Sequence, residues 1–365
     1  MSINYNMSNL IIINYYTNLN SNIKYKMAGF DLDYTIIKTK SGNIFPKDKN
    51  DWELLNNLIK PKLLELSNNP EYIIVIFSNQ KGIGNSKKSD VAIKDFQDKI
   101  HNIRKLLGFD FIFIASLEDD IYRKPRIGMF DYLKSENGLK IKIGKFGSFY
   151  VGDMAGRKGD KYDTDLKFAL NLNVNFMTPE QYFINKDHNE KTTIYGYRLD
   201  NFSTNTKINI NPESNKMVII SGYPGAGKSH LAKKFTLESM NNKSFELFSR
   251  DKLQNKFHKK LEEAMELGTP VVIEGLYADN NARSELKNLA AKYHYNTVYV
   301  LVKTSYELAY HLNLFRSLYQ NKNKVPEIVY MKYRKIFEYP EQSDWGEIIE
   351  YHPHISKKIN KLFLY

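Results

Sequence analysis

The eight residues GYPGAGKS at positions 222–229 constrain the fold of this chain more than any other stretch. They match the pattern G-x-x-x-x-G-K-S/T, in which a glycine-rich loop joins a strand to a helix. The apolar run MVIIS precedes the loop, and a helical pattern begins at Lys228. A strand, this loop and a helix in that order predict an α/β domain with a parallel sheet.

The same loop predicts a site for a nucleoside triphosphate. Its backbone amides and the helix N-terminus attract negative charge, and Gly222, Gly225 and Gly227 would let the backbone wrap the phosphates. Lys228 would reach the β- and γ-phosphates, and Ser229 would hold Mg²⁺. The alternative is a glycine-rich turn without a ligand, which the surrounding strand and helix disfavour. We therefore expect ATP and Mg²⁺ as cofactors.

Two further residues of this half are candidates for phosphoryl transfer. Asp251 in SRDKL follows a short apolar stretch, and its carboxylate could take a proton from an attacking hydroxyl. A helix N-cap aspartate explains Asp251 equally well on local grounds. Arg316 in HLNLFRSL lies on a late predicted helix that could cover the phosphoryl group, and an exposed structural arginine is the alternative.

The first half of the chain alternates strands and helices between residues 26 and about 173. MAGFDL, YIIVIFSN, FIFIAS and SFYVGD read as strands, and YIIVIFSN is a continuous apolar run of the kind that parallel sheets bury on both faces. Helices are expected over residues 52–67, 89–107 and 127–136. This order predicts a second α/β domain, and the second half continues with VVIEG, NTVYVLV and helices near 304–318 and 326–338.

Polar residues follow three of the strands in the first half. Asp31 and Asp33 end the first strand, Ser78 and Asn79 the second, and Asp153 follows SFYVG. Ligands of open α/β sheets bind at this edge, so these side chains predict a site there. A turn with solvated caps is the alternative for the two aspartates of FDLDYTII taken alone.

Composition limits the classes of protein. The 365 residues suit two domains, and 42% hydrophobic with 26% charged residues indicates a globular chain. The absence of cysteine excludes disulfides and zinc–thiolate sites and favours an intracellular setting. A net charge of +12 favours a polyanionic partner such as nucleic acid, with a general basic bias as the alternative.

The ends and the junction are less informative. LIIINYY is too short to span a membrane and lacks the flanking signals of a signal peptide, so we expect an opening strand or a poorly ordered extension and no membrane association. The stretch 188–215 is rich in Asn, Ser and Thr. The predicted organisation is an N-terminal extension (1–25), a first domain (26–200), a linker (201–215) and a second domain (216–365).

Four motifs in each half, in matching order, resemble the polynucleotide kinase 3′-phosphatase family. GFDLDYTII, VIFSNQKGIG, YRKPRIGMF and YVGDMAGRKGD resemble its phosphatase half, which is of the haloacid dehalogenase-like type. GYPGAGKSH, SRDKL, HLNLFR and VYMKYRKIFEYP resemble its P-loop kinase half. The resemblance covers residues 26–352, and we expect no counterpart of the forkhead-associated domain found in the animal enzymes.

The resemblance implies roles in the first half. Asp31 would attack a terminal 3′-phosphate and form an aspartyl-phosphate, and Asp33 would protonate the leaving oxygen and then activate water. Mg²⁺ would be held by Asp31, the backbone carbonyl of Asp33 and Asp153. Ser78, with its neighbour Asn79, would bind the phosphate. Lys124 would also bind it and stabilise the transition state, an ordinary surface lysine being the alternative.

Several positions depart from the family pattern. Tyr34 stands where the family usually has glycine, so the loop or the pocket mouth differs. IEGLY replaces I-D-x-T-N, so Glu274 could keep an acidic role, whereas Tyr277 lacks an asparagine contact to the nucleic-acid end. Leu314 replaces the first arginine of N-N-R-F-R, and Arg316 matches the second. In the last phosphatase motif Asp165 matches a family aspartate, and the matches of Asp160 and Asp163 are less certain.

The resemblance implies a monomeric enzyme that removes 3′-phosphates from polynucleotide ends, expected to be DNA, and transfers the γ-phosphate of ATP to 5′-hydroxyls. A ligase would be its downstream partner. The alternatives are a metabolite phosphatase fused to a small-molecule kinase, a 3′-phosphatase with a weak or inactive kinase half, and an end-binding adaptor. Nucleus, cytoplasm and viral factory are equally open as compartments.

Overall fold

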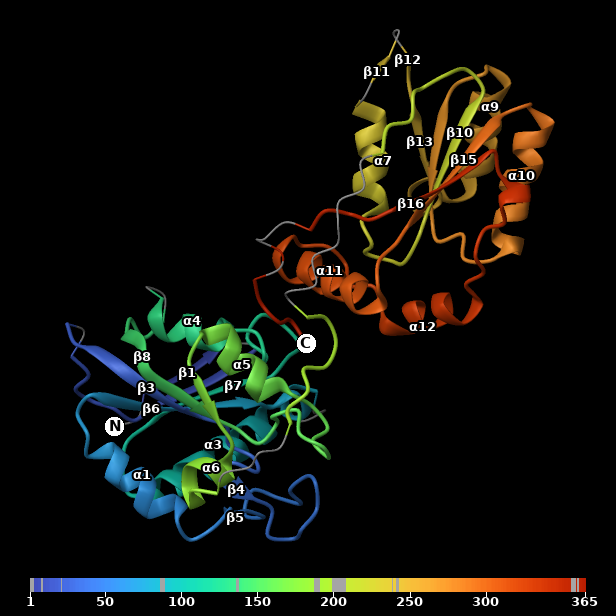
Figure 1. The fold of residues 1–365 in the computed structure, drawn as a ribbon. Helices are drawn as coiled ribbons and strands as arrows, with labels where there is room; N and C mark the ends of the chain where they lie inside the picture. Colours follow the sequence, from blue (N-terminus) through green and yellow to red (C-terminus); the bar gives the residue numbers. More distant parts are fainter. Residues whose placement is uncertain are drawn as a thin grey trace. The chain divides into compact units, whose positions relative to one another are not determined.

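The computed structural model describes all residues except 1–2, 8, 21, 86–88, 136–137, 187–190, 199–207, 238, 241–242, 356–358 and 360. The chain forms two compact α/β units (Figure 1). One comprises Met1–Arg198 together with Lys361–Tyr365, and the other comprises Leu199–Asn360. The predicted end of the first domain at residue 200 lies close to Arg198, where the main segment of the first unit ends. The last five residues were predicted to belong to the second domain, but they group with the first unit.

A seven-stranded sheet forms the centre of the first unit, in the order β1-β2-β7-β6-β3-β8-β9. β2 is antiparallel to both of its neighbours, β1 and β7. All the other neighbouring strands of this sheet are parallel. The stretch LIIINYY supplies β2, which is buried along its whole length. The strands are β1 (Ile3–Met7), β2 (Leu10–Asn14), β3 (Lys24–Phe30), β6 (Tyr72–Asn79), β7 (Ile112–Ser116), β8 (Lys142–Val151) and β9 (Asn175–Met177).

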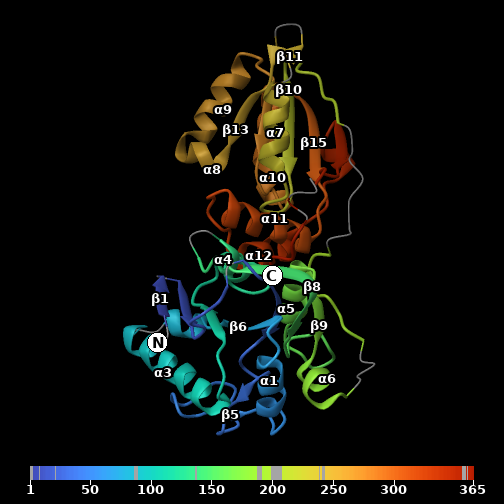
Figure 2. The ribbon, with the colours of Figure 1, turned by 90° about the vertical axis from the view of Figure 1, so that its left-hand side faces the viewer.

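Helices cover both faces of this sheet (Figures 1 and 2). One hydrophobic core lies under α1, α3 and α6, and the other lies under α4 and α5. The helices predicted over 89–107 and 127–136 are confirmed. These helices are α1 (Ile59–Ser67), α3 (Ser89–Leu107), α4 (Gly128–Lys134), α5 (Thr164–Leu172) and α6 (Pro179–Ile184), with a short α2 (Lys81–Gly84) after β6.

The helix predicted over residues 52–67 is wrong in its first part. The helix begins at Ile59, and Glu53–Leu54 forms β5, which pairs with β4 (Ile37–Lys38). The amide of Leu55 donates to the carbonyl of Ile36, so this segment finds its backbone partners in a neighbouring loop rather than within a helix. Tertiary pairing therefore overrides the local helical pattern.

The second unit has a five-stranded parallel sheet in the order β13-β14-β10-β15-β16. One face packs under α7, and the other packs under α9 and α10 (Figure 1). The predicted strands and late helices are confirmed. The elements are β10 (Lys216–Ser221), α7 (Lys228–Leu237), β13 (Glu246–Ser249), α8 (Arg250–Leu253), α9 (Phe257–Glu266), β14 (Val271–Glu274), α10 (Asn280–Lys292), β15 (Asn296–Val302), α11 (Tyr306–Tyr319), α12 (Glu327–Ile336) and β16 (Glu347–Tyr351), besides a small hairpin of β11 (Ser239–Met240) and β12 (Lys243–Ser244).

Part of the predicted linker belongs to this second unit. Residues 201–207 lie outside the described residues, but Ile208 and Ile210 are buried in the core beneath α7. Among the described residues, no helix combines the length and the apolar character that a membrane crossing requires.

Candidate active sites

The predicted residues of the first unit lie at adjacent strand ends. Asp31 directly follows β3, Ser78 lies near the end of β6, and Asp153 follows β8. These three strands are neighbours in the sheet, in the order β6-β3-β8, and they run parallel. Their carboxyl ends therefore meet at one edge, where a ligand can contact side chains from all three.

Lys124 is the centre of this cluster. Its Nζ donates hydrogen bonds to Asp31, to Asp165 Oδ1 at 2.8 Å, to the Tyr150 hydroxyl at 2.9 Å and to the Phe77 carbonyl at 3.1 Å. The side chain is only 3% exposed, so the alternative of an ordinary surface lysine is wrong. Burial alone would lower its pKa, but the charges of Asp165 and Asp31 hold the pKa of Lys124 above its usual value.

Three carboxylates of this cluster fit a divalent cation. One oxygen each from Asp31, Asp153 and Asp165 can lie within 4.8 Å of one another. Burial raises the pKa of Asp31 and of Asp153, and the neighbouring carboxylates add to both shifts. A crowded set of buried carboxylate oxygens is a donor set that suits Mg²⁺, which would supply the missing positive charge.

Asp165 was predicted as a family match but not as a metal ligand. It stands in the first turn of α5, is 1% exposed, and its second oxygen accepts a hydrogen bond from the Met154 amide at 3.1 Å. The other two aspartates of that motif turn to other partners. Asp160 pairs with Arg157, and Asp163 pairs with Lys167.

Asp33 lies beside this cluster in a more open position. Its Oδ2 accepts a hydrogen bond from Gln80 Nε2 at 2.7 Å, and its Oδ1 lies 3.9 Å from Lys99 Nζ. Gln80 Nε2 also donates to Ser78 Oγ at 2.9 Å, so one amide joins the predicted acid–base residue to the predicted phosphate-binding hydroxyl. A half-exposed carboxylate held in this way can exchange protons with a substrate oxygen or with water.

Asn79 has partners that its predicted role did not include. Its Nδ2 donates to the Lys124 carbonyl at 3.1 Å, and its Oδ1 accepts from the Lys124 amide at 2.9 Å. The side chain therefore holds the backbone of Lys124 from both sides, and phosphate binding by Asn79 remains a prediction.

Sequence reasoning missed three side chains of this site. They are Gln80, Lys99 and Tyr150. Lys99 carried a signal, because it is a lone lysine on the buried face of α3 between Phe96 and Ile100. Tyr150 stands in an apolar strand and carried no signal that separates it from a core residue.

The glycine-rich loop of the second unit lies as predicted between β10 and α7, and α7 begins at Lys228. Gly225 and Gly227 have φ of 77° and 96°, in the left-handed region. A Cβ on Gly225 would lie 2.8 Å from the Ala309 carbonyl of α11, so conformation and space both require glycine here.

Lys228 is folded back onto its own loop. Its Nζ donates to the Gly222 carbonyl at 2.9 Å and to the Tyr223 carbonyl at 2.8 Å. Burial lowers the pKa of Lys228 to about 8, although the negative charge of Glu274 acts in the opposite direction and raises it. Neutral carbonyls are weaker partners for an ammonium than phosphate oxygens are, so this contact is one that a triphosphate can replace.

The other predicted residues of this site, Ser229, Asp251 and Arg316, lie near Lys228, as does Glu274. Ser229 Oγ donates to Glu274 Oε2 at 2.5 Å, and Glu274 ends the neighbouring strand β14. The charges of Asp251 and Arg316 both act on the pKa of Lys228, the first raising it and the second lowering it. A Mg²⁺ ion at Ser229 would therefore have a carboxylate next to it, as a triphosphate site requires.

The two local alternatives in this unit are wrong. The residue before α8 is Ser249, so Asp251 lies inside the first helical turn and is not an N-cap. Arg316 is half-buried on α11, and its Nε is buried without a hydrogen-bond partner among the described residues. An exposed structural arginine does not fit that position, and a buried unpaired guanidinium nitrogen calls for an anionic ligand.

The departures from the family pattern have distinct environments. Tyr34 has a φ of 57°, is 38% exposed, and its hydroxyl donates to the Asn43 carbonyl at 3.3 Å. Tyr277 has a φ of 37° and is 6% exposed. Leu314 is buried in α11. Both tyrosines thus occupy left-handed backbone that disfavours bulky side chains, one at the surface and one in the core.

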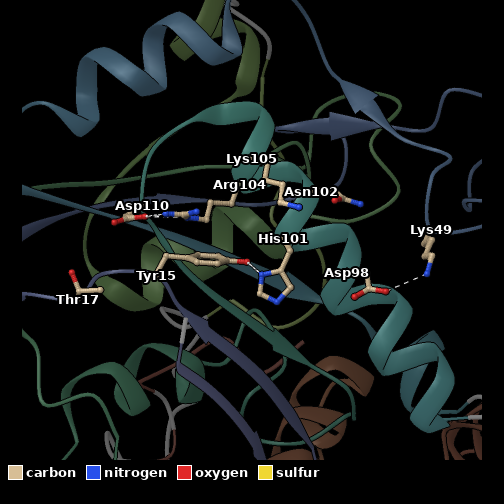
Figure 3. A pocket seen from close by; sticks show the side chains of 9 residues that line it. All are labelled: Tyr15, Thr17, Lys49, Asp98, His101, Asn102, Arg104, Lys105 and Asp110. Carbon is tan, nitrogen blue, oxygen red and sulfur yellow. Dashed lines mark hydrogen bonds and ion pairs between the residues drawn. The ribbon is translucent and has the colours of Figure 1, made fainter. Parts of the chain in front are cut away.

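A cavity of about 630 Å³ lies elsewhere on the first unit (Figure 3). Two ion pairs lie in its lining, Lys49 with Asp98 and Arg104 with Asp110. The Tyr15 hydroxyl shares a hydrogen bond of 2.6 Å with His101, whose pKa is lowered by burial. None of the predicted site residues lines it, so this cavity is separate from the chemistry described above. Its lining consists of Tyr15, Thr17, Lys49, Asp98, His101, Asn102, Arg104, Lys105 and Asp110.

Comparison with known proteins matches both units. The family model described as polynucleotide kinase 3 phosphatase matches residues 26–183, and the one described as AAA domain matches residues 217–340. The bifunctional polynucleotide phosphatase/kinase of Schizosaccharomyces pombe is 34% identical over 323 residues, covering 86% of this chain and 76% of that protein.

Two further relatives match most of the chain and part of it, respectively. A protein of Acanthamoeba polyphaga mimivirus, named provisionally as a bifunctional polynucleotide phosphatase/kinase, is 32% identical over 365 residues, covering 89% of this chain and 84% of that protein. The polynucleotide 3′-phosphatase of Saccharomyces cerevisiae is 33% identical over 205 residues, covering 42% of this chain and 85% of that protein. With a phosphatase-type cluster in one unit and a triphosphate loop in the other, the chain belongs to the family of bifunctional polynucleotide phosphatase/kinases.

Proposed function

We propose that the chain removes phosphate from the 3′ ends of polynucleotides and transfers the γ-phosphate of ATP to their 5′-hydroxyl ends. The observation that carries this proposal is the cluster in which Lys124 binds Asp31 and Asp165 next to Asp153. Such a cluster provides a nucleophile, a metal site and a fixed positive charge for one phosphate.

The phosphatase reaction proceeds in two steps. A carboxylate oxygen of Asp31 attacks the phosphorus, the bond to the 3′-oxygen breaks, and Asp33 gives that oxygen a proton. Asp33 then takes a proton from water, which attacks the aspartyl-phosphate, so that inorganic phosphate leaves and Asp31 is restored. Lys124 and Ser78 hold the phosphate oxygens throughout. Asp31, Asp153 and the Asp33 carbonyl, with Asp165 as a further candidate ligand, would hold Mg²⁺, which would supply positive charge that reduces repulsion between the phosphate and the nucleophile.

The kinase reaction takes place in the second unit. Asp251 accepts the proton of the 5′-hydroxyl, whose oxygen attacks the γ-phosphorus of ATP while the bond to ADP breaks. Lys228 leaves its loop carbonyls for the β- and γ-phosphates, and Arg316 balances the charge on the transferred group. Gly222, Gly225 and Gly227 let the loop wrap the phosphates, and Ser229 would hold the Mg²⁺ of the nucleotide.

The finer assignments extend this proposal. The first unit, Met1–Arg198 with Lys361–Tyr365, carries the phosphatase, so the predicted N-terminal extension (1–25) is part of it. The second unit carries the kinase, and a monomer acts on DNA ends that a ligase then joins. The net charge of +12 supports a polyanionic substrate over a small metabolite.

A phosphatase with a weak kinase half is the second candidate, because two family positions are altered. Tyr277 and Leu314 are both buried, so neither offers the polar contact that the family residues would make. An oligonucleotide with a 5′-hydroxyl and labelled ATP separates the two candidates by the presence or absence of transfer.

A panel of substrates tests the proposal. We expect phosphate release from a 3′-phosphorylated oligonucleotide, much less from a 3′-nucleotide, and ATP-dependent labelling of a 5′-hydroxyl oligonucleotide. Parallel DNA and RNA substrates test the substrate class. The affinity for an oligonucleotide should fall linearly on a log–log scale as salt rises, since counterion release drives such binding. Turnover of the 3′-nucleotide that is faster than turnover of the oligonucleotide, together with an oligonucleotide affinity that does not change with salt, would contradict the proposal.

A further inference from the structure

The last five residues, Lys361–Tyr365, are here called the tail. They belong to the first unit, although the whole second unit precedes them in the sequence. The end of the chain lies beside α5 in both ribbon views (Figures 1 and 2). The phosphatase-type unit is therefore built from two separate pieces of sequence.

The backbone of the last three tail residues is bound by side chains of the first unit. Asn171 on α5 donates Nδ2 to the Phe363 carbonyl at 2.8 Å and accepts from the Phe363 amide at 2.8 Å. Arg126 Nε donates to the Leu364 carbonyl at 2.9 Å. Lys167 Nζ, also on α5, completes the series with the Tyr365 carbonyl at 2.6 Å. Three successive tail carbonyls thus each have a side-chain donor.

The side chains of the tail are also fitted to the unit. Leu364 is 2% exposed. The ring of Tyr365 packs on Gly196, where a Cβ would lie 2.6 Å from a ring atom, and its hydroxyl accepts a hydrogen bond from the Tyr197 amide at 3.2 Å. A segment held by paired backbone groups and buried apolar contacts is an integral part of the unit.

The residues that bind the tail are connected to the catalytic cluster. Asn171 Nδ2, besides binding Phe363, donates to the Pro125 carbonyl at 2.8 Å, next to Lys124 in the chain. Arg126 follows Pro125, so the tail contacts the loop that carries Lys124. Asp165, which binds Lys124 Nζ, stands in the first turn of α5, the helix that also carries Asn171. Both supports of Lys124 are therefore in contact with the tail.

Arg126 and Lys167 make this arrangement sensitive to loss of the tail. Both cationic side chains are buried, and each keeps one carboxylate partner, Asp119 for Arg126 and Asp163 for Lys167. Removing the tail would take away its carbonyl acceptors together with the buried side chains of Phe363 and Leu364, so the loop and the helix would lose the contacts that fix their positions. A shift of about 1 Å at a catalytic group can lower a rate by about 100-fold.

We propose that the tail positions Lys124 for phosphate hydrolysis, so that the phosphatase requires residues from beyond the kinase-type unit. The inference rests on the proposed 3′-phosphatase activity. The tail residues do not touch the substrate and act through Asn171, Arg126 and α5.

Three variants of the full chain test this inference. One ends before Lys361. The second carries Asn171→Ala, which keeps the tail residues but removes the hydrogen bonds that join Phe363 to Asn171 and Asn171 to Pro125. The third, Lys361→Ala, is the matched control because Lys361 is exposed. We measure kcat and KM for a 3′-phosphorylated oligonucleotide, kinase kcat on a 5′-hydroxyl oligonucleotide, and thermal unfolding. We expect phosphatase kcat to fall about tenfold to 100-fold in the first two variants, with KM and kinase kcat within about twofold of wild type.

The outcomes separate a positioning role from simple packing. If a folded tail-less chain or Asn171→Ala keeps wild-type phosphatase kcat and loses only thermal stability, the inference is overturned. If the tail-less chain does not fold, Asn171→Ala decides alone. A lower kcat in Lys361→Ala as well would also overturn it, because Lys361 is exposed and is not one of the tail residues whose bonds to Asn171, Arg126 and Lys167 carry the inference. A wild-type chain without 3′-phosphatase activity would overturn the proposed function itself, and the inference with it.

Discussion

The two sites hold their central lysines in opposite ways. In the first unit Lys124 is bound by two carboxylates, and its pKa is raised by their charges. In the second unit Lys228 is bound by two neutral carbonyls of its own loop, and burial lowers its pKa to about 8. One lysine is fixed in place before a substrate arrives, and the other is held by partners that a triphosphate can replace.

This difference matches the ligand that each site must bind. A 3′-phosphate is small and enters a site whose charges are already arranged, so preorganisation serves the chemical step. A nucleoside triphosphate is large and brings its own negative charge, so a lysine held only by carbonyls can move onto it. The first site therefore depends on the elements that surround Lys124, and the second depends on the nucleotide.

The largest effect should follow from the nucleophile of the first site. Asp31→Asn keeps the shape of the side chain but removes the carboxylate that attacks phosphorus, so 3′-phosphate release should fall by at least about 10⁴-fold. Kinase turnover should stay at the wild-type level. Phosphate release from a 3′-phosphorylated oligonucleotide measures the first, and labelling of a 5′-hydroxyl measures the second. Near-normal release in this variant would refute the covalent mechanism.

The next largest effect should come from the lysine of the second site. Lys228→Ala removes the ammonium that balances the triphosphate, so 5′-phosphorylation should fall by about 100-fold or more, and the 3′-phosphatase should be unchanged.

A mixture of this variant with Asp31→Asn is the matched test. It should convert a nick with a 3′-phosphate and a 5′-hydroxyl into one that a ligase can seal, which neither variant does alone. Loss of the phosphatase in a folded Lys228→Ala protein would show that the two sites are not independent.

Much of both sites could be predicted from the sequence because strand ends are local signals. Asp31, Ser78 and Asp153 each end or follow an apolar run, and parallel strands bring such positions to one edge. The loop around Lys228 was predictable for the same reason, since strand, glycines and helix are contiguous.

Contacts between distant elements could not be predicted in this way. Lys99 reaches Asp33 only because α3 packs against the sheet, and Asn171 binds Phe363 across 192 positions of the chain. Residues 53–54 read as helical but pair with β4, which no local pattern reveals. Periodicity reports which face of an element is buried, and it does not report which element covers that face.

The opposite pKa shifts of the two lysines predict different pH dependence. Above pH 8 the empty second site has a largely uncharged Lys228, and ATP must restore its charge, so binding takes up a proton. The affinity for ATP should therefore fall by up to about tenfold per pH unit between pH 8 and 10, and should not change through this group below pH 8. Lys124, with its raised pKa, should give the first site no such dependence.

Calorimetric titration with ATP in buffers of different ionisation enthalpy measures both the affinity and the proton uptake. Lys228→Arg is the control, because a guanidinium stays charged throughout this range and should remove the pH slope. Wild-type affinity that is constant from pH 8 to 10 would show that the empty loop keeps Lys228 charged, and the contrast between the two sites would then fail.

The smallest predicted effect is a change in the free energy of unfolding. It distinguishes Tyr277 from Tyr34, the two tyrosines that depart from the family pattern. The hydroxyl of Tyr277 is buried without a hydrogen-bond partner among the described residues, whereas that of Tyr34 reaches the Asn43 carbonyl at the surface. An unpaired buried polar group costs about 1–3 kcal/mol, so Tyr277→Phe should raise the free energy of unfolding by about 1 kcal/mol. Tyr34→Phe, the matched control, should change it by less than about 0.5 kcal/mol. Urea unfolding measures both, and a Tyr277→Phe protein that is less stable than wild type would show that its hydroxyl has a partner in solution.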